Sequence, residues 1–324
     1  MVGLTVGLAV LLVATVGVVT WLSPPASPAA TGPRTASTAR PATTSAPATP
    51  TSPATSATAA VPTQQSPRPV PRPSSSPSKP AEPKPPRTGL KSNSLYDIDL
   101  SGSGSCKAKV RRPDPPLKNS ALAPYLRTIV ACLMDTFRAP LARQGFTLRT
   151  PKVKTYKGSI KTPCGRVGSS SNPAFYCART IYWPVASDDG REAYTLARLG
   201  YVGLAAHEFG HHLQSTTGML YEYGVSYADA SRSGRLTLSR RLELQAQCFE
   251  GVVLAHNRKA LGISSQDRRE IRQWHSFTGD EDPPSSRQPD HGTSKAQLGW
   301  LDKGLDGADF GRCNTWSASK KAVK

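Results

Sequence analysis

The sequence contains the pattern H-E-x-x-H at residues 207–211, within a stretch that reads as a helix. Residues four apart lie on one face of an α-helix, about one turn from each other, so His207 and His211 can offer two imidazole nitrogens to the same ion. Glu208 is rotated about 100° around the helix axis, where it can reach a water molecule bound to that ion. The spacing therefore predicts a zinc site with two ligands and a general base on a single helix.

The alternative interpretation is that these histidines are ordinary packed or solvated groups. With 6 His in 324 residues the pattern is rare by chance, which favours the metal site. His212 lies off the ligand face, and we interpret it as structural. The helical pattern covers residues 192–216 and includes Gly200, Gly203 and Gly210. Each glycine costs about 1 kcal/mol relative to Ala, which indicates that another backbone approaches this helix closely.

A catalytic zinc needs a third protein ligand, and the segment 240–251 offers one. Glu243, Gln247 and Glu250 form a stripe at i, i+4 and i+7, beside an apolar stripe of the same helix. We predict that Glu243 is the third ligand, with Glu250 and Glu222 as rivals. The alternative is a solvated carboxylate paired with a neighbouring arginine.

The N-terminal residues 1–22 form an apolar run that is long enough, at about 1.5 Å per residue, to cross a hydrocarbon core of roughly 30 Å. A basic segment of the kind that opens a secretory signal is absent, so we favour an uncleaved transmembrane anchor. Small residues after Leu22 keep a cleaved signal sequence as the alternative. Because basic residues follow the run and none precedes it, the positive-inside rule does not support export of the C-terminal part.

Residues 23–92 consist mainly of Pro, Ala, Ser and Thr, a composition that cannot bury enough apolar surface to fold. This segment is expected to be a disordered, extended stalk between the membrane and residues 93–324, which form one domain. A disordered tail without a spacing role is the alternative.

Within residues 93–324 the hydrophobic pattern predicts a mixed α+β fold that is mostly helical. Residues 121–145 read as an amphipathic helix, whereas residues 146–156 and 175–185 are compatible with short strands of a small sheet. If the segment 181–185 is an edge strand, it can align an extended peptide by main-chain pairing.

The chain has six cysteines, all beyond the stalk, and an even number in an exported chain favours three disulfides in an oxidising compartment. Cys164 and Cys177 are the favoured local pair because they are close in sequence across a Gly- and Ser-rich stretch. The other four are Cys106, Cys132, Cys248 and Cys313. None of the six has the C-x-x-C spacing of a structural zinc site.

Basic residues exceed acidic ones, 41 Lys and Arg against 22 Asp and Glu, which gives a formal net charge of +19. A field of that sign favours anionic cell-surface polymers or lipid headgroups as partners. Nucleic acid is not expected as a partner, because the basic residues are scattered and lack the aromatic interleaving of a stacking platform.

Four sequence segments, taken in order, resemble the bacterial neutral zinc metallopeptidase family, whose members are membrane-tethered. They are Cys164-Gly165 leading to Phe175-Tyr176-Cys177, the helix with His207-Glu208-Phe209-Gly210-His211-His212, the segment Glu243-Leu244-Gln245-Ala246-Gln247-Cys248, and His291-Gly292-Thr293-Ser294 followed by Cys313-Asn314-Thr315. Together these segments span most of residues 120–316. The resemblance implies a zincin-like domain with zinc bound by His207, His211 and Glu243, and with Glu208 as the catalytic base. It also implies a disulfide between Cys248 and Cys313.

The chain departs from the family pattern at Gln247, where the family has Asp. In comparable helical zinc sites that carboxylate orients a ligand histidine, so Gln247 is the predicted second-shell group. An amide accepts a hydrogen bond but carries no charge, which puts catalytic activity in question more than the fold. His291 is a further candidate, as a donor to the oxyanion of a tetrahedral intermediate, with a locally bonded loop histidine as the alternative.

Together these features predict an extracytoplasmic zinc-dependent peptidase, anchored in the membrane or secreted, that acts on peptide or protein substrates. Metal-activated water is expected to attack the peptide bond, with Glu208 as general base. The alternative is a catalytically weak, zinc-containing surface domain that binds or scaffolds other molecules.

Overall fold

The computed structural model describes residues 85–107, 110, 117, 119–168, 174–185, 199–281 and 289–324. The apolar run at residues 1–22 and almost all of the predicted stalk lie outside these residues. Among the helices that the structure describes, none combines the length and apolarity needed to span a membrane.

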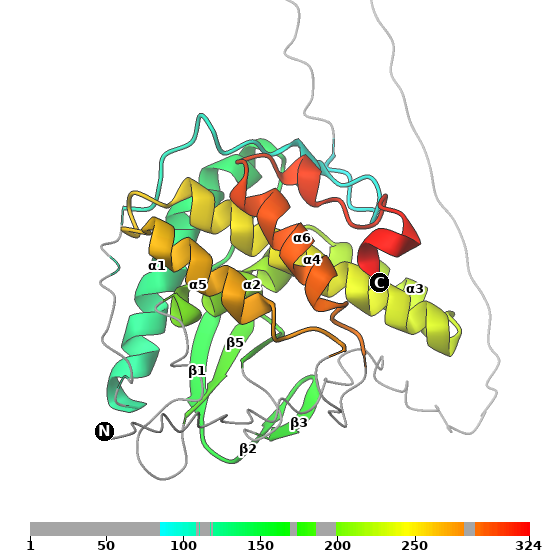
Figure 1. Cartoon of the computed structure of the whole chain (residues 1–324), viewed down its shortest axis with the longest axis horizontal. Coiled ribbons are helices and arrows are strands. Elements are labelled where there is room, and N and C mark those ends of the chain that lie inside the picture. Colours follow the sequence, from blue (N-terminus) through cyan, green and yellow to red (C-terminus); the bar gives the residue numbers. More distant parts are fainter. Residues whose placement is uncertain are drawn as a thin grey trace, which may run out of the picture. The chain divides into compact units, whose positions relative to one another are not determined.

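The described domain is a mixed α+β structure, as predicted, with six α-helices above a small set of strands (Figure 1). The helices are α1 (Asn119–Arg143), α2 (Gly200–Thr216), α3 (Met219–Ala228), α4 (Arg232–His256), α5 (Ser265–His275) and α6 (Ser294–Leu305). Short 3-10 helices cover Ser94–Asp97, Phe310–Cys313 and Lys320–Val323. Of the helix predicted over residues 192–216, the structure forms the part from Gly200, and residues 192–198 lie outside the described residues.

The strands form a three-stranded sheet and a separate hairpin. The sheet has the order β1 (Lys152–Tyr156), β5 (Thr180–Pro184) and β4 (Phe175–Cys177), with β1 parallel and β4 antiparallel to β5. The hairpin pairs β2 (Ser159–Thr162) with β3 (Gly165–Gly168). The prediction of an edge strand at residues 181–185 is therefore wrong, because β5 is the central strand: β1 pairs along its whole length and β4 pairs with residues 180–182 on the other side.

The predicted amphipathic helix at residues 121–145 corresponds to α1, which packs one face into the main core. Its stripe of Ile129, Leu133, Phe137 and Leu141 is completely buried. Phe137 also contacts Phe209 of α2, with the ring centroids 5.8 Å apart. This contact joins α1 to the helix that carries the H-E-x-x-H motif.

Helix α2 lies at the centre of the domain and packs against α4. Phe209 and Leu213 of α2 and Phe249 of α4 are fully buried. The close backbone approach predicted for α2 is present at Gly210, where a Cβ atom would lie 3.2 Å from the Cα of Ala246. Because the two helices touch at this point, side chains that flank the contact on both helices are brought together.

Three disulfides hold the domain, and they use all six cysteines. Cys164 is bonded to Cys177, Cys248 to Cys313 and Cys106 to Cys132. The Cys164–Cys177 bond has the pairing favoured from sequence proximity, and Cys248–Cys313 has the pairing implied by the family resemblance. The latter joins α4 to the C-terminal segment and so attaches that segment to one of the two site helices.

Candidate metal centre

Three polar side chains from α2 and α4 converge on one point. The Nε2 atoms of His207 and His211 each lie 3.3 Å from Oε2 of Glu243. The three candidate ligand atoms all lie within 4.8 Å of one another. His207 and His211 come from successive turns of α2, as the spacing predicts, and Glu243 reaches them from α4 across the Gly210 contact.

The spacing of these atoms fits a tetrahedral zinc ion. With ligand bonds of about 2.0 to 2.1 Å, neighbouring ligand atoms of such an ion are about 3.3 Å apart. Two imidazole nitrogens and one carboxylate oxygen are also a common ligand set of catalytic zinc, which leaves the fourth position for water or substrate. The residues present therefore fit the predicted metal.

Glu243 occupies this place rather than Glu250 because of the geometry of α4. Seven residues of helix separate the two carboxylates by about 10 Å along the axis. Glu250 instead faces Gly203, where a Cβ atom would lie 2.7 Å from its Oε1 atom. Among the described residues, the potential metal cluster that includes His207 and His211 contains neither Glu250 nor Glu222.

Glu208 is buried beside the cluster, with only 4% of its surface exposed. Its Oε2 atom is buried and has no hydrogen-bond partner among the residues that the structure describes. Burial raises the pKa of the Glu208 carboxyl, and the neighbouring His211 and His207 partly offset this effect. A buried acceptor in this position needs a donor, and a water molecule or a substrate group at the metal can supply it.

Glu243 and the neighbouring histidines shift each other's pKa. Burial alone would raise the pKa of Glu243, but His211, His291 and His207 together hold it well below its usual value. Burial disfavours the charged form of His211, yet attraction to Glu243 and the hydrogen bond to it outweigh burial and raise the pKa of His211 to about 9. The site therefore favours a positive charge next to the Glu243 carboxylate.

His291 approaches the same point from the loop before α6. Its Nε2 atom lies 3.8 Å from Glu243 Oε2. Its Nδ1 atom is 2.8 Å from Oδ1 of Asp290, and its backbone N–H donates to Asp280 Oδ1 at 2.9 Å. The ring is thus held through Nδ1 while Nε2 is directed toward the cluster.

Asp280, Asp290 and His291 are themselves close enough together to be considered as ligands of a second ion. The hydrogen bonds argue against that use. Asp280 Oδ2 accepts from Gly292 N–H and from Arg240 Nε, each at 2.9 Å, and Asp280 Oδ1 accepts from His291 N–H. Both oxygens of Asp280 are therefore engaged in fixing the His291 loop.

Comparison with known proteins agrees with this geometry. Residues 94–316 match the family described as "Putative neutral zinc metallopeptidase". The chain belongs to this family. Among its relatives is the uncharacterized protein YpfJ of Escherichia coli strain K12, which is 31% identical over 242 residues, or 69% of this chain and 83% of YpfJ.

More distant relatives come from mycobacteria. The uncharacterized proteins Mb2605 of Mycobacterium bovis and Rv2575 of Mycobacterium tuberculosis strain H37Rv are each 26% identical over 195 residues. The matched region covers 52% of this chain and 63% of each relative. No solved structure matches the chain.

In this member of the metallopeptidase family, Gln247 does not make the contact predicted for it. Its Nε2 atom lies 2.8 Å from Glu250 Oε2 and 3.0 Å from His275 Nε2. Because Gln247 lies one turn beyond Glu243 on α4, its amide points toward Glu250 and away from the ligand histidines. Within the described part of the chain, no hydrogen bond joins Gln247 to His207 or His211.

His212 has the structural position expected for it. Its Nε2 atom is 2.7 Å from the carbonyl oxygen of Arg149, which can only accept, so Nε2 carries the proton. Its Nδ1 atom, 3.1 Å from the hydroxyl of Tyr176, therefore accepts a hydrogen bond from that hydroxyl. Burial lowers the pKa of His212 to about 4, partly opposed by the bond to Arg149. His212 is thus a neutral link between α2 and the strand region.

Sequence reasoning missed two groups at the site. Gln214, three residues after His211 on α2, accepts a hydrogen bond from His211 Nδ1 at 2.9 Å. The Tyr156 hydroxyl, at the end of β1, is buried and without a partner among the described residues. Burial raises its pKa, and the Glu208 charge adds to this effect. The i, i+3 spacing from His211 is a signal that points to Gln214, whereas no local pattern points to Tyr156.

Proposed function

We propose that this chain is an extracytoplasmic zinc-dependent peptidase. His207, His211 and Glu243 would hold the zinc ion, as the spacing of their ligand atoms supports. The observation that carries the proposal is the buried, unpartnered Oε2 atom of Glu208 beside these three ligand atoms. A purely structural zinc site has no use for a buried base at that position.

In this reaction the bound zinc would lower the pKa of a water molecule to about 7 and polarise the peptide carbonyl. Glu208 accepts the proton of the attacking water and later donates it to the leaving amine. Its raised pKa suits both steps, because a carboxyl group with a pKa nearer to neutrality both accepts and releases a proton readily. Burial also keeps bulk water from competing for the proton.

His291 is the proposed donor to the developing oxyanion. The Asp290 carboxylate accepts a hydrogen bond from Nδ1–H, which leaves Nε2 to face the reacting carbonyl. To donate to the oxyanion, Nε2 must carry a proton as well as Nδ1, which is the case in the imidazolium form of the ring. Two tyrosines of α3 are alternative donors, but the structure places them in other surroundings. Tyr221 is 73% exposed, and the Tyr223 hydroxyl lies 2.8 Å from the Ser239 hydroxyl.

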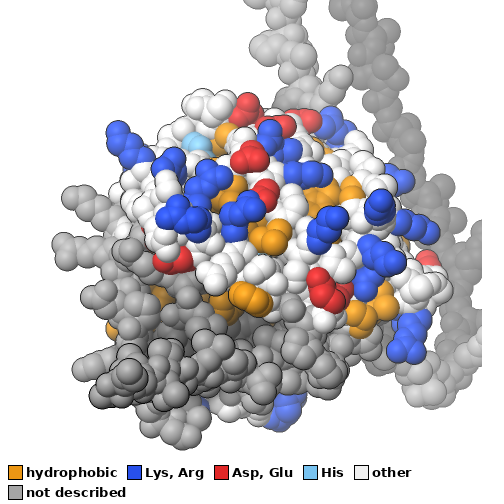
Figure 2. All heavy atoms as spheres, viewed as in Figure 1, with side chains coloured by type: hydrophobic (Ala, Val, Ile, Leu, Met, Phe, Trp, Pro, Cys, Tyr) orange, Lys and Arg blue, Asp and Glu red, His pale blue; other side chains and the backbone are white. Residues whose placement is uncertain are grey.

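The proposed location is outside the cytoplasm, by attachment of the N-terminal segment to the membrane or by secretion. Three disulfides are the supporting feature, because disulfides persist in oxidising compartments. Peptide or protein chains are the proposed substrates. Lys and Arg side chains are spread over the face shown in Figure 2, with acidic groups among them, and they suit an anionic cell-surface polymer as a further partner.

The test compares the full-length chain with its Glu208→Gln variant. Zinc content and cleavage of an unstructured protein are measured for both. The variant Glu222→Gln makes the same chemical change at a partly buried carboxylate outside the cluster and serves as the matched control. One zinc per chain in all three proteins, with cleavage lost in Glu208→Gln alone, is the expected result.

Two other results would contradict the proposal. If zinc binds but the unaltered chain cleaves no substrate, the catalytically weak surface domain becomes the better explanation, and Gln247 is its sequence basis. If the unaltered chain binds no zinc, the assignment of the metal site is wrong.

A further inference from the structure

Gln214 is a completely buried amide that contacts the candidate ligand His211. The distance from His211 Nδ1 to Gln214 Oε1 is 2.9 Å. Which of the two ring nitrogens carries the proton depends on the orientation of this amide, because its oxygen accepts and its nitrogen donates. The partners on the other side of the amide decide that orientation.

The nitrogen of Gln214 faces two acceptors. Its Nε2 atom lies 2.9 Å from the carbonyl oxygen of Leu242 and 3.0 Å from Oε1 of Gln245. A backbone carbonyl can only accept, so the Gln214 nitrogen must point to Leu242 and its oxygen to His211. His211 Nδ1 therefore carries a proton, and its Nε2 atom is the one directed toward Glu243, 3.3 Å from Oε2.

Gln245 is oriented by the same kind of reasoning. Its Nε2 atom donates to the carbonyl oxygen of Cys313 at 3.2 Å and to the hydroxyl of Tyr96 at 2.8 Å. Its Oε1 atom is then the acceptor for Gln214, and also for the indole N–H of Trp316 at 3.4 Å. The two amides thus form a relay of hydrogen bonds from His211 through Gln214 to Gln245. In each bond of this relay the direction of donation is fixed, because each amide also donates to a backbone carbonyl, that of Leu242 or of Cys313.

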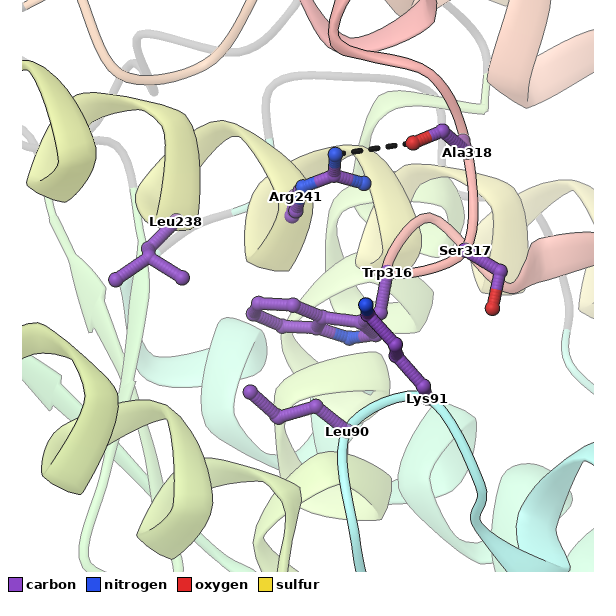
Figure 3. Close-up of a pocket in the computed structure, with 7 residues that line it drawn as sticks. All are labelled: Leu90, Lys91, Leu238, Arg241, Trp316, Ser317 and Ala318. Carbon is purple, nitrogen blue, oxygen red and sulfur yellow. Dashed lines mark hydrogen bonds between the residues drawn. The ribbon is translucent and has the colours of Figure 1, made fainter.

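The relay connects the metal cluster to the two ends of the domain. Cys313 is bonded to Cys248 of α4, and the Tyr96 hydroxyl donates to the carbonyl oxygen of Leu90 at 2.8 Å. Trp316 lines a cavity of about 460 Å³ together with Leu90 and Arg241 (Figure 3). Segments far apart in the sequence therefore hold the amides from several sides.

We propose that Gln214 is a positioning residue that holds His211 with Nδ1 protonated and Nε2 presented to zinc, and that Gln245 supports it. This inference rests on the proposed zinc site. Partners of this kind that orient ligand histidines typically contribute 10- to 100-fold to metal affinity. The inference assigns to Gln214 the role that the sequence pattern suggested for Gln247.

The first test is the variant Gln214→Met, which keeps the side-chain length and removes both hydrogen-bonding groups. We expect its zinc dissociation constant, measured by competition with a chelator, to rise by about 10- to 100-fold. Gln245→Met should raise the constant less, because the bond from Gln214 to Leu242 remains. The matched control is Asn257→Leu, which removes another completely buried amide about 20 Å along α4 from Glu243. It should lose thermal stability without a change in zinc affinity.

A second measurement needs no variant. In the zinc-loaded chain labelled with ¹⁵N-histidine, the Nδ1 of His211 should carry a slowly exchanging proton, and Nε2 should show the shift of a metal-bound nitrogen. The inference is overturned if the Nδ1 of His211 lacks that proton, or if Gln214→Met binds zinc as tightly as Asn257→Leu. If the unaltered chain binds no zinc, the proposed function fails instead. The nuclear magnetic resonance result decides the matter even if Gln214→Met does not fold.

Discussion

Gly210 of α2 lies so close to Ala246 of α4 that a Cβ atom at position 210 would stand 3.2 Å from the Ala246 Cα. This contact is next to His211 on one helix and one turn from Glu243 on the other. The separation of the two helices at this point therefore sets the distance between the ligands that they carry. A small residue is needed here because the close neighbour is backbone, which cannot move aside as a side chain can.

The variant Gly210→Ala tests this relationship. A methyl group would gain about 1 kcal/mol in helix propensity but would overpack the contact at a cost of about 1 to 3 kcal/mol. We expect a net loss of stability of about 1 kcal/mol and a weaker affinity for zinc, measured by thermal unfolding and chelator competition. Increased stability with unchanged zinc affinity would show that this contact does not set the spacing.

Where α4 and α6 cross, substitution of Gly304 should destabilise the protein more than substitution of Gly210. A Cβ atom at position 304 would lie 2.1 Å from the carbonyl oxygen of Cys248, so Gly304→Ala must push the helices apart. We expect a loss of about 3 kcal/mol in the free energy of unfolding, measured by urea denaturation. Gly299 is on the same helix with nothing within 4 Å of its Cβ position. Gly299→Ala should instead stabilise the protein by up to about 1 kcal/mol, and equal effects of the two changes would contradict the packing.

Removal of the His291 side chain should separate catalysis from metal binding. If its Nε2 atom donates to the oxyanion, His291→Ala should lower kcat by about 10²- to 10³-fold. KM and zinc content should change little, because His291 is not one of the three ligands. The control is His256→Ala, at the end of α4, where the ring contacts the carbonyl of Gly104. A loss of zinc in His291→Ala would show that it is a ligand rather than an oxyanion donor.

The lowered pKa of His212 predicts that the free energy of unfolding falls on mild acidification. In the unfolded chain this histidine binds a proton below about pH 6.5, whereas burial lowers its pKa in the folded protein to about 4. Protons therefore bind preferentially to the unfolded state between these values, so the stability contribution is present above pH 6.5 and is lost as the pH falls toward 4. The pKa difference corresponds to a loss of about 3 kcal/mol.

Urea denaturation at pH 7 and pH 4.5 measures this effect. The variant His212→Gln should be less stable than the unaltered chain at pH 7 but should lose less stability between the two pH values. Other titrating groups, Glu243 among them, contribute to both proteins and cancel in the comparison. An equal pH dependence in the two proteins would contradict the assignment to His212.

Local spacing was sufficient to predict the parts of the site that lie on one element. His207 and His211 share a helix face because of the period of the α-helix, and Cys164 pairs with Cys177 across a short segment. The recurrence of four apolar residues at intervals of four also predicted the buried face of α1. These features depend on residues close together in sequence, and the backbone geometry of one element is enough to place them.

Only the tertiary structure decided which side chains from other parts of the chain contact the two histidines of α2. Glu243 and Glu250 lie on the same stripe of α4, and the position of the Gly210 contact determines which of them reaches the histidines. The amide next to His211 is that of Gln214, whereas Gln247 lies against Glu250 and His275. The carbonyls of Leu242 and Cys313 then fix the direction of the amide hydrogen bonds. The order of strands likewise depends on long-range pairing, which periodicity within a single strand does not encode. Contacts between distant segments depend on how whole helices and strands pack against one another. That packing depends on all the elements at once, so the spacing of residues within one element does not predict it.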